Sequence, residues 1–306
     1  MSGIGKQNRR LQADFYAVDC NGENDFVQLL QQVGTMPDDT PAKTYSINGV
    51  DPVRLIRFLT PTIDREPVME GIFTKIRMTG LPVKASSTSD AQEDIDFSDT
   101  EGVGESTAFL YVPARKILVL QRNRYGLTTN AFEEYFQYFA DRRCAVRLIP
   151  VISRHTLQRL SAARRLTKLT FKILPVASKD DLKSDVATLS HALACMESVG
   201  AATLSVDLSV APRSKNSLVH STIMGAINTL LHLSNSFSCA REVRKLQVAI
   251  KEDGNSSVAI LDLLRDKVSY SENVSYDASR RLTDDAKLSF LESAWKAQRN
   301  SFVFPE

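Results

Sequence analysis

The sequence has no apolar run near the length of about 20 residues that a helix needs to cross a bilayer. Its first residues, MSGIGKQNRRLQADF, are basic and lack the apolar stretch of a secretory signal. Cysteines are few and far apart, with no CxxC or Cys/His ligand spacing: Cys20, Cys144, Cys195 and Cys239. These absences predict a cytoplasmic protein with reduced thiols, rather than a membrane-spanning protein, a disulfide framework or a zinc site.

Signatures of catalysis are missing as well. The sequence GIGK near the N-terminus lacks the spacing and the Ser/Thr of a phosphate-binding P-loop, and no HExxH, GxSxG or Rossmann glycine motif occurs. The four histidines are scattered, and His191 and His220 fall in apolar helical segments, which favours structural roles. A triad assembled from residues distant in sequence stays open. We therefore expect neither an enzyme nor a bound cofactor or metal.

Opposite charges are segregated along a chain whose formal net charge is only +2. The segment from Arg115 to Lys172 has thirteen Lys/Arg and three carboxylates, whereas Asp90 to Glu105 has seven carboxylates and no cation. Such segregation indicates a polyanionic partner better than the net charge does.

The acidic segment fits a calcium-binding loop only in part. Asp94, Asp96, Ser98 and Glu105 match positions 1, 3, 5 and 12 of the loop, but Asp99 occupies the position that needs glycine. A solvated acidic loop is the favoured interpretation. A second hypothesis is that this loop mimics a polyanion and covers the basic segment until a partner displaces it.

Hydrophobic periodicity predicts an α+β fold: a globular domain built on a mixed or antiparallel sheet, with a second, smaller α/β domain. We expect a flexible N-terminus over 1–12 and a sheet-rich domain over 13–175, with the acidic loop at 84–106. Residues 176–242 read as a smaller helix-strand-helix domain, which could be mobile. Residues 243–306 read as a hairpin and a C-terminal helix that return to the larger domain.

The segment VLQRNRYGLTTNAFEEYFQYFADRR, from Val119 to Arg143, predicts a strand that leads into a helix. Gly126 would allow a sharp turn, and Thr128 or Thr129 would cap the helix. Arg122 and Arg124 alternate on the strand end and would point to one face, beside amide groups that favour an anion.

Further basic residues follow. The stretch RHTLQRLSAARRL reads as a short basic helix, and LTKLTFKILPV after it reads as a strand. If the segment were helical throughout, Arg154, Arg164, Arg165 and Lys168 would lie on roughly one side of the helix. Arginine matches phosphate in a bidentate way, and contacts to the phosphate backbone do not depend on base sequence. We therefore predict a surface that binds a phosphate-rich partner, with a well-solvated basic surface as the alternative. The candidate phosphate-contacting residues, which become DNA-binding residues under the resemblance described next, are Arg122, Arg124, Tyr125, Thr128, Thr129, Arg142, Arg143, Arg154, Arg159, Arg164, Arg165 and Lys168.

The stretch DTEGVGESTAFLYVPARKILVLQRNRYGLTTNAFEEYF resembles the middle of the RexA-like phage-exclusion proteins in order and spacing. The shared pattern is an acidic lead-in, two strands joined by a short turn, an arginine before an aromatic, and Gly-x-Thr-Thr opening a helix. The chain is also similar in organisation to the KwaB proteins of the Kiwa anti-phage system.

This resemblance implies a homodimeric, cytoplasmic, nonspecific DNA-binding protein of antiviral defence or superinfection exclusion. It also implies a membrane-embedded partner that could recruit the protein to the inner membrane. The residues carried over by position are Arg122, Arg124, Gly126, Thr128 and Thr129.

Two other functions stay open. Asp180 to Lys183, DDLK, contains the Asp-x-Lys fragment of metal-dependent nucleases, although it reads better as the start of a helix. The protein could also be an interaction scaffold or sensor that does not bind DNA.

Overall fold

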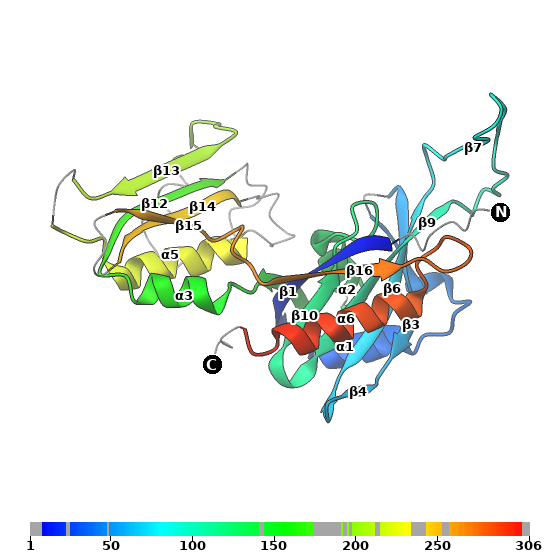
Figure 1. The fold of residues 1–306 in the computed structure, drawn as a ribbon, viewed down its shortest axis with the longest axis horizontal. Helices are drawn as coiled ribbons and strands as arrows, with labels where there is room; N and C mark the ends of the chain where they lie inside the picture. Colours follow the sequence, from blue (N-terminus) through cyan, green and yellow to red (C-terminus); the bar gives the residue numbers. More distant parts are fainter. Residues whose placement is uncertain are drawn as a thin grey trace. The chain divides into compact units, whose positions relative to one another are not determined.

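The computed structural model describes residues 8–22, 25–47, 49–140, 144–173, 191, 195, 198–211, 215–233, 243–252 and 257–301. The chain divides into two compact units, each built from three separate stretches of the sequence (Figure 1). Unit 1 consists of residues 1–13, 20–146 and 270–296, and unit 2 of residues 14–19, 147–269 and 297–306. Each unit has its own sheet and its own helices.

The larger sheet has eight strands in the order β11-β1-β10-β9-β6-β3-β2, with β16 also paired to β1. The ladders from β10 through β2 are antiparallel. The bounds are β1 (Asn8–Gly22), β2 (Thr44–Ile47), β3 (Asp51–Leu59), β6 (Met69–Arg77), β9 (Val103–Val112), β10 (Ile117–Gln121), β11 (Cys144–Pro150) and β16 (Ser269–Ser275). Shorter elements are η1 (Pro41–Lys43), β4 (Thr62–Ile63), β5 (Glu66–Pro67), β7 (Lys84–Ala85), β8 (Gln92–Glu93) and η2 (Pro113–Arg115).

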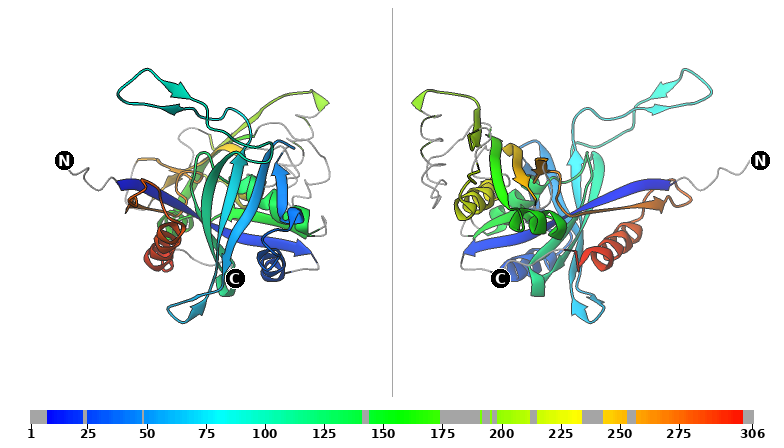
Figure 2. Two further views of the ribbon diagram at one scale, coloured as in Figure 1. Left: turned by 90° about the vertical axis from the view of Figure 1, so that its right-hand side faces the viewer. Right: turned by 60° about the vertical axis from the view of Figure 1, so that its left-hand side comes forward.

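Helices cover both faces of the sheet in unit 1. Helices α1 (Phe26–Gly34) and α2 (Thr129–Phe139) lie on one face, and α6 (Asp284–Gln298) lies on the other (Figure 2). The α2 side is an aromatic core in which Phe73 on β6 contacts Phe109 and Phe132 with ring centroids 5.5 and 5.6 Å apart. Burial of such large apolar side chains is the main source of stability for this unit.

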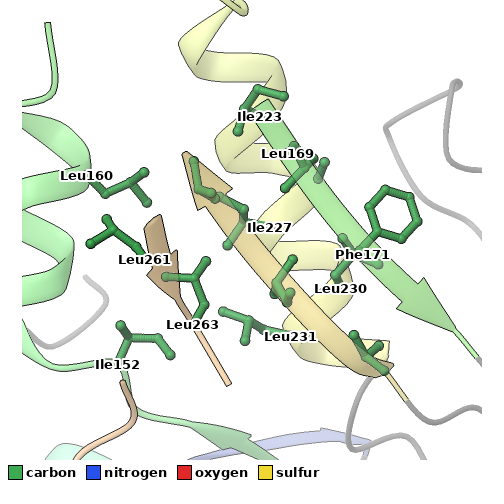
Figure 3. Packing of buried hydrophobic residues seen from close by; sticks show 14 of the residues in the cluster. Ile152, Leu160, Leu169, Phe171, Ile223, Ile227, Leu230, Leu231, Leu261 and Leu263 are labelled. Atoms are coloured by element: carbon green, nitrogen blue, oxygen red, sulfur yellow. The ribbon is translucent and has the colours of Figure 1, made fainter. Parts of the chain in front are cut away.

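The sheet of unit 2 has four antiparallel strands in the order β13-β12-β14-β15. They are β12 (Arg165–Ile173), β13 (Leu204–Ser209), β14 (Val243–Lys251) and β15 (Ala259–Asp262), and the helices of the unit are α3 (Arg154–Ser161) and α5 (His220–Leu233). Both helices pack on one face of the sheet, where Leu160, Leu169, Ile227 and Leu230 are buried together (Figure 3). The opposite face carries the alternate residues of every strand.

The predicted α+β class is confirmed, with antiparallel sheets and helices on their faces. The flexible N-terminus predicted for 1–12 is wrong for residues 8–12, which belong to β1. Strand β12 was placed in the larger domain by sequence, but it pairs with β13 and β14 in unit 2, which therefore begins near residue 147. Local periodicity identified the strand without revealing its partners, because those lie far away in sequence.

The structure also bears on the predictions about the cysteines and about membrane-spanning helices. Cys20 is disulfide-bonded, which corrects the expectation that all four thiols are reduced, while Cys195 is free. Within the described residues, no helix combines the length and the apolar character that crossing a membrane requires.

Candidate nucleic-acid interface

The outward face of the sheet in unit 2 is rich in lysine. Along β12, Leu169, Phe171 and Ile173 point to the helices and are buried, so the intervening Lys168 and Lys172 point outward. Strand β14 alternates in the same way: Leu246, Val248 and Ile250 are buried in the core, so the residues between them point outward. We call the outward set the lysine face; it includes Arg165, Lys168, Thr170, Lys172, Lys245, Gln247, Lys251, Ser205, Asp207, Ser209 and Asp262.

Like charges lie directly opposite one another on this face. Lys172 pairs in register with Lys245, and both side chains are exposed. At the other end of the same ladder Arg165 pairs with Lys251. Side chains directly opposite in an antiparallel pair have Cβ atoms about 5 Å apart, and like charges there are destabilising. An arrangement that costs stability in the free protein becomes favourable when an anion binds between the cations.

Carboxylates on the lysine face neutralise only part of this charge. Asp207 on β13 accepts a hydrogen bond of 2.5 Å from the Thr170 hydroxyl and forms an ion pair of 3.2 Å with Lys168. These partners, the Thr170 hydroxyl first, lower the pKa of the Asp207 carboxyl. Asp262 on β15 accepts a hydrogen bond of 2.9 Å from Gln247 Nε2. Lys172 lies opposite Ser205, and Lys245 is among the charges that lower the Asp207 pKa, so Asp207 offsets only part of the positive charge at this end of the ladder.

The five predicted DNA-binding residues of unit 2 do not share one helical side, because α3 ends at Ser161 and Arg165 and Lys168 belong to β12. Lys168 lies on the lysine face. The Arg165 guanidinium donates to the Asn216 carbonyl at 2.6 Å. Arg159 pairs with Glu252 at 2.7 Å, and this hydrogen bond raises the pKa of the guanidinium.

Arg154 and Arg164 are exposed; Arg154 is the first residue of α3, and Arg164 lies between α3 and β12. The predicted helical face is therefore corrected: the basic segment is split between a helix, a loop and a strand. Its charges spread over several surfaces of the unit.

The predicted arginine site of unit 1 is a turn that is held by its own side chains. Asn123 Nδ2 donates to the Ser106 carbonyl at 3.0 Å, and Asn123 Oδ1 accepts from the Tyr125 amide. Thr128 is the N-cap of α2, because its hydroxyl oxygen accepts from the Ala131 amide at 3.2 Å. Thr129 is the first helical residue. The turn thus supplies its own hydrogen bonds and does not require a bound anion for its shape.

Gly126 is needed for close approach and not for an unusual backbone conformation. Its φ is not positive, but a Cβ built on it would stand 2.2 Å from Thr107 Oγ1. That hydroxyl oxygen accepts from the Leu127 amide at 3.0 Å. The predicted turn is present, because the Gly126 amide donates to the Asn123 carbonyl at 3.3 Å, but glycine is required there by packing against β9 and not by its own backbone conformation.

The remaining residues of the turn are at the surface. The Arg122 guanidinium donates to Gln12 Oε1 at 3.2 Å, and Arg124 lies over the ring of Tyr125 at 5.7 Å from its centroid. Tyr125 is 56% exposed, so part of its side chain is accessible to a partner. Arg142 and Arg143 lie outside the described residues, as does the Asp180–Lys183 segment.

Sequence reasoning missed three cations of the lysine face: Lys172, Lys245 and Lys251. The signal was present as a period of two in TKLTFKI and RKLQVAIK, where lysines alternate with buried apolar residues. The pairing of the two strands could not be read from that period.

Residues 6–301 match the model of a family described as a family of unknown function, DUF6731. The chain belongs to this family. No curated protein matches the DUF6731 chain.

Proposed function

We propose that this DUF6731 protein binds double-stranded DNA without sequence preference through the lysine face of unit 2. The observation that carries the proposal is the cross-strand pair of Lys172 and Lys245, two exposed like charges held side by side. A phosphate between two such ammonium groups replaces a repulsion by two attractions.

The chemistry of the lysine face fits phosphates better than bases. Lysine is a compact point charge on a flexible stem, and it suits phosphate oxygens whose exact positions vary. The surrounding Thr170, Gln247 and Ser205 can donate hydrogen bonds to phosphate or sugar oxygens. Contacts of this type give an affinity that falls steeply with salt and does not depend on sequence.

Salt titration tests the proposal directly. Fluorescence anisotropy of labelled duplexes of several sequences, from about 50 to 200 mM salt, should give similar affinities with a steep slope. The variant Lys172→Gln/Lys245→Gln should lower the slope of log affinity against log salt by roughly 2, because about 0.9 is lost per phosphate contact. The control Lys84→Gln/Lys215→Gln removes two exposed lysines outside the face and should leave the slope unchanged. Equal slopes in both variants would exclude the lysine face as the binding surface.

The biological setting is proposed from the resemblance to RexA-like and KwaB-like proteins. In this setting the protein is a cytoplasmic homodimer of antiviral defence or phage exclusion that acts with a membrane-embedded partner. Disulfides are rare in the cytosol, so the disulfide at Cys20 makes the location testable. Thiol alkylation in intact cells should label Cys20 if the protein is cytoplasmic and reduced, and should leave it unlabelled if the location is oxidising.

A protein-interaction scaffold is the alternative function. The exposed Tyr125 and Tyr138 on unit 1, at 56% and 52%, are residue types that protein interfaces favour. Absence of DNA binding at 50 mM salt, together with a partner that co-purifies after nuclease treatment, would favour the scaffold.

A further inference from the structure

A buried carboxylate lies beneath the C-terminal helix of unit 1. Glu70 on β6 is only 3% exposed, and among the described residues its Oε1 atom has no hydrogen-bond partner. Gly71 and Phe73 face the aromatic core on the α2 side, so Glu70 faces the other side of the sheet, which α6 covers (Figure 2). A buried ionised carboxylate without a full set of partners is costly, so the site favours a proton.

The charges around Glu70 come from two elements. Glu292 on α6 adds a second negative charge and forms an ion pair of 3.4 Å with Lys296 one turn later. Arg57 on β3 opposes it, but its guanidinium is also bound to Asp285 at 2.7 Å. Burial first, and then Glu292, raise the pKa of the Glu70 carboxyl to about 7.

Two other cations near α6 are paired with carboxylates. Lys287 pairs with Asp284 at 3.1 Å, and Arg115 pairs with Glu66 at 2.9 Å. On β9 the residue opposite Glu70 is the apolar Leu110. Full compensation of a Glu70 charge would therefore require Arg57 to leave Asp285.

We propose that Glu70 and Glu292 form a proton-sensitive latch that sets how firmly α6 is held on the sheet of unit 1. With Glu70 protonated, the interface holds one carboxylate and α6 is firmly packed. With Glu70 ionised, a buried charge without a full set of partners lies on the face that α6 covers, within the influence of the half-exposed Glu292, and the packing weakens. This inference concerns unit 1 and does not depend on the DNA-binding proposal.

The sign of the pH effect follows from linkage. The folded-state pKa of about 7 is above the ordinary value of 4.5, so the folded protein binds the proton more tightly than the unfolded chain does. The stabilising effect is complete below pH 4.5, declines as the pH rises, and is lost above pH 7. Over this window the unfolding equilibrium constant should rise by roughly 100-fold or more.

The single tryptophan of the chain is a built-in reporter for this interface. Trp295 lies on α6 with 0% exposure, and the Arg115 guanidinium lies 5.4 Å from its ring centroid. Unpacking of α6 moves this ring into water and shifts its emission to longer wavelength.

The test is urea unfolding of the full chain followed by Trp295 emission at several pH values between 5 and 8.5. The wild-type midpoint should fall as the pH rises toward 7 and then level off. Glu70→Gln should abolish that fall, and the control Asp90→Asn, an exposed carboxylate in the acidic loop, should keep it.

Two further variants distinguish a latch from a general pH effect. Glu292→Gln removes a charge that raises the Glu70 pKa, so the profile should shift to lower pH. Arg57→Gln removes a charge that lowers it, so the profile should shift to higher pH. These opposite shifts keep the latch testable if Glu70→Gln does not fold. Identical profiles in the wild type and these variants would overturn it.

Discussion

The turn before α2 in unit 1 and the lysine face in unit 2 both have cations at the surface, but the surroundings of those cations differ. At the turn, Asn123 and Thr128 satisfy the local backbone, and Arg124 lies over Tyr125. On the lysine face, Lys172 and Lys245 are aligned with each other. The turn is complete as a structural junction, whereas the face retains an unfavourable interaction that a polyanion would relieve. Accumulated charge of this kind is stronger evidence for a ligand than exposure alone.

The largest expected effect is the difference in duplex affinity between charge reversal on the lysine face and charge reversal at the turn. Lys172→Glu/Lys245→Glu replaces two attractions by two repulsions and should weaken duplex binding by roughly 100-fold at low salt. Arg122→Glu/Arg124→Glu makes the same change in charge and should weaken binding by about threefold or less. Anisotropy titrations in one buffer measure both. The reverse order of effects would make the turn, and not the lysine face, the DNA-binding site.

The second prediction concerns stability at the turn. Gly126→Ala places a methyl group against Thr107 Oγ1, where the distance would be 2.2 Å. The crowding should lower the free energy of unfolding by about 2 kcal/mol, the typical cost of overpacking. Chemical denaturation measures this loss. The folded variant should bind DNA as the wild type does; a large loss of affinity without a loss of stability would contradict our view of the turn as structural.

These two regions also show how far the sequence alone could lead. The N-cap was predicted at Thr128 or Thr129 and lies at Thr128; the sequence could narrow it this far because capping depends on residues adjacent in sequence. The reason for Gly126 was missed because Thr107, its close neighbour, lies on another strand. The basic strand was recognised, but the opposition of Lys172 and Lys245 depends on a register that shifts between Lys172 and Ile173. Charge and period can be read locally, whereas pairing across a sheet is set by tertiary structure.

The third prediction separates capping from anion binding at α2. Thr128→Ala removes the hydroxyl that accepts from the Ala131 amide and should cost about 1 kcal/mol of unfolding free energy. Thr128→Asn replaces it with a good capping residue and should restore most of that stability. Thermal or urea unfolding measures both variants. A loss of DNA affinity in Thr128→Ala that Thr128→Asn does not restore would assign the helix end to DNA contact.

The smallest expected effect is on duplex affinity when the carboxylate on the lysine face is removed. Asp207 neutralises Lys168 and accepts from Thr170, so Asp207→Asn should release positive charge and tighten duplex binding by about threefold. Because those partners lower its pKa, Asp207 stays ionised from pH 6 to 8, and the gain should be the same across that range. Stability should change little, since the ion pair with Lys168 is exposed. Asp90→Asn alters the net charge by the same amount away from the face, so tighter binding there as well would indicate an effect of overall charge. Tighter binding in Asp207→Asn alone would mean that this one carboxylate competes with phosphate for the lysines of β12.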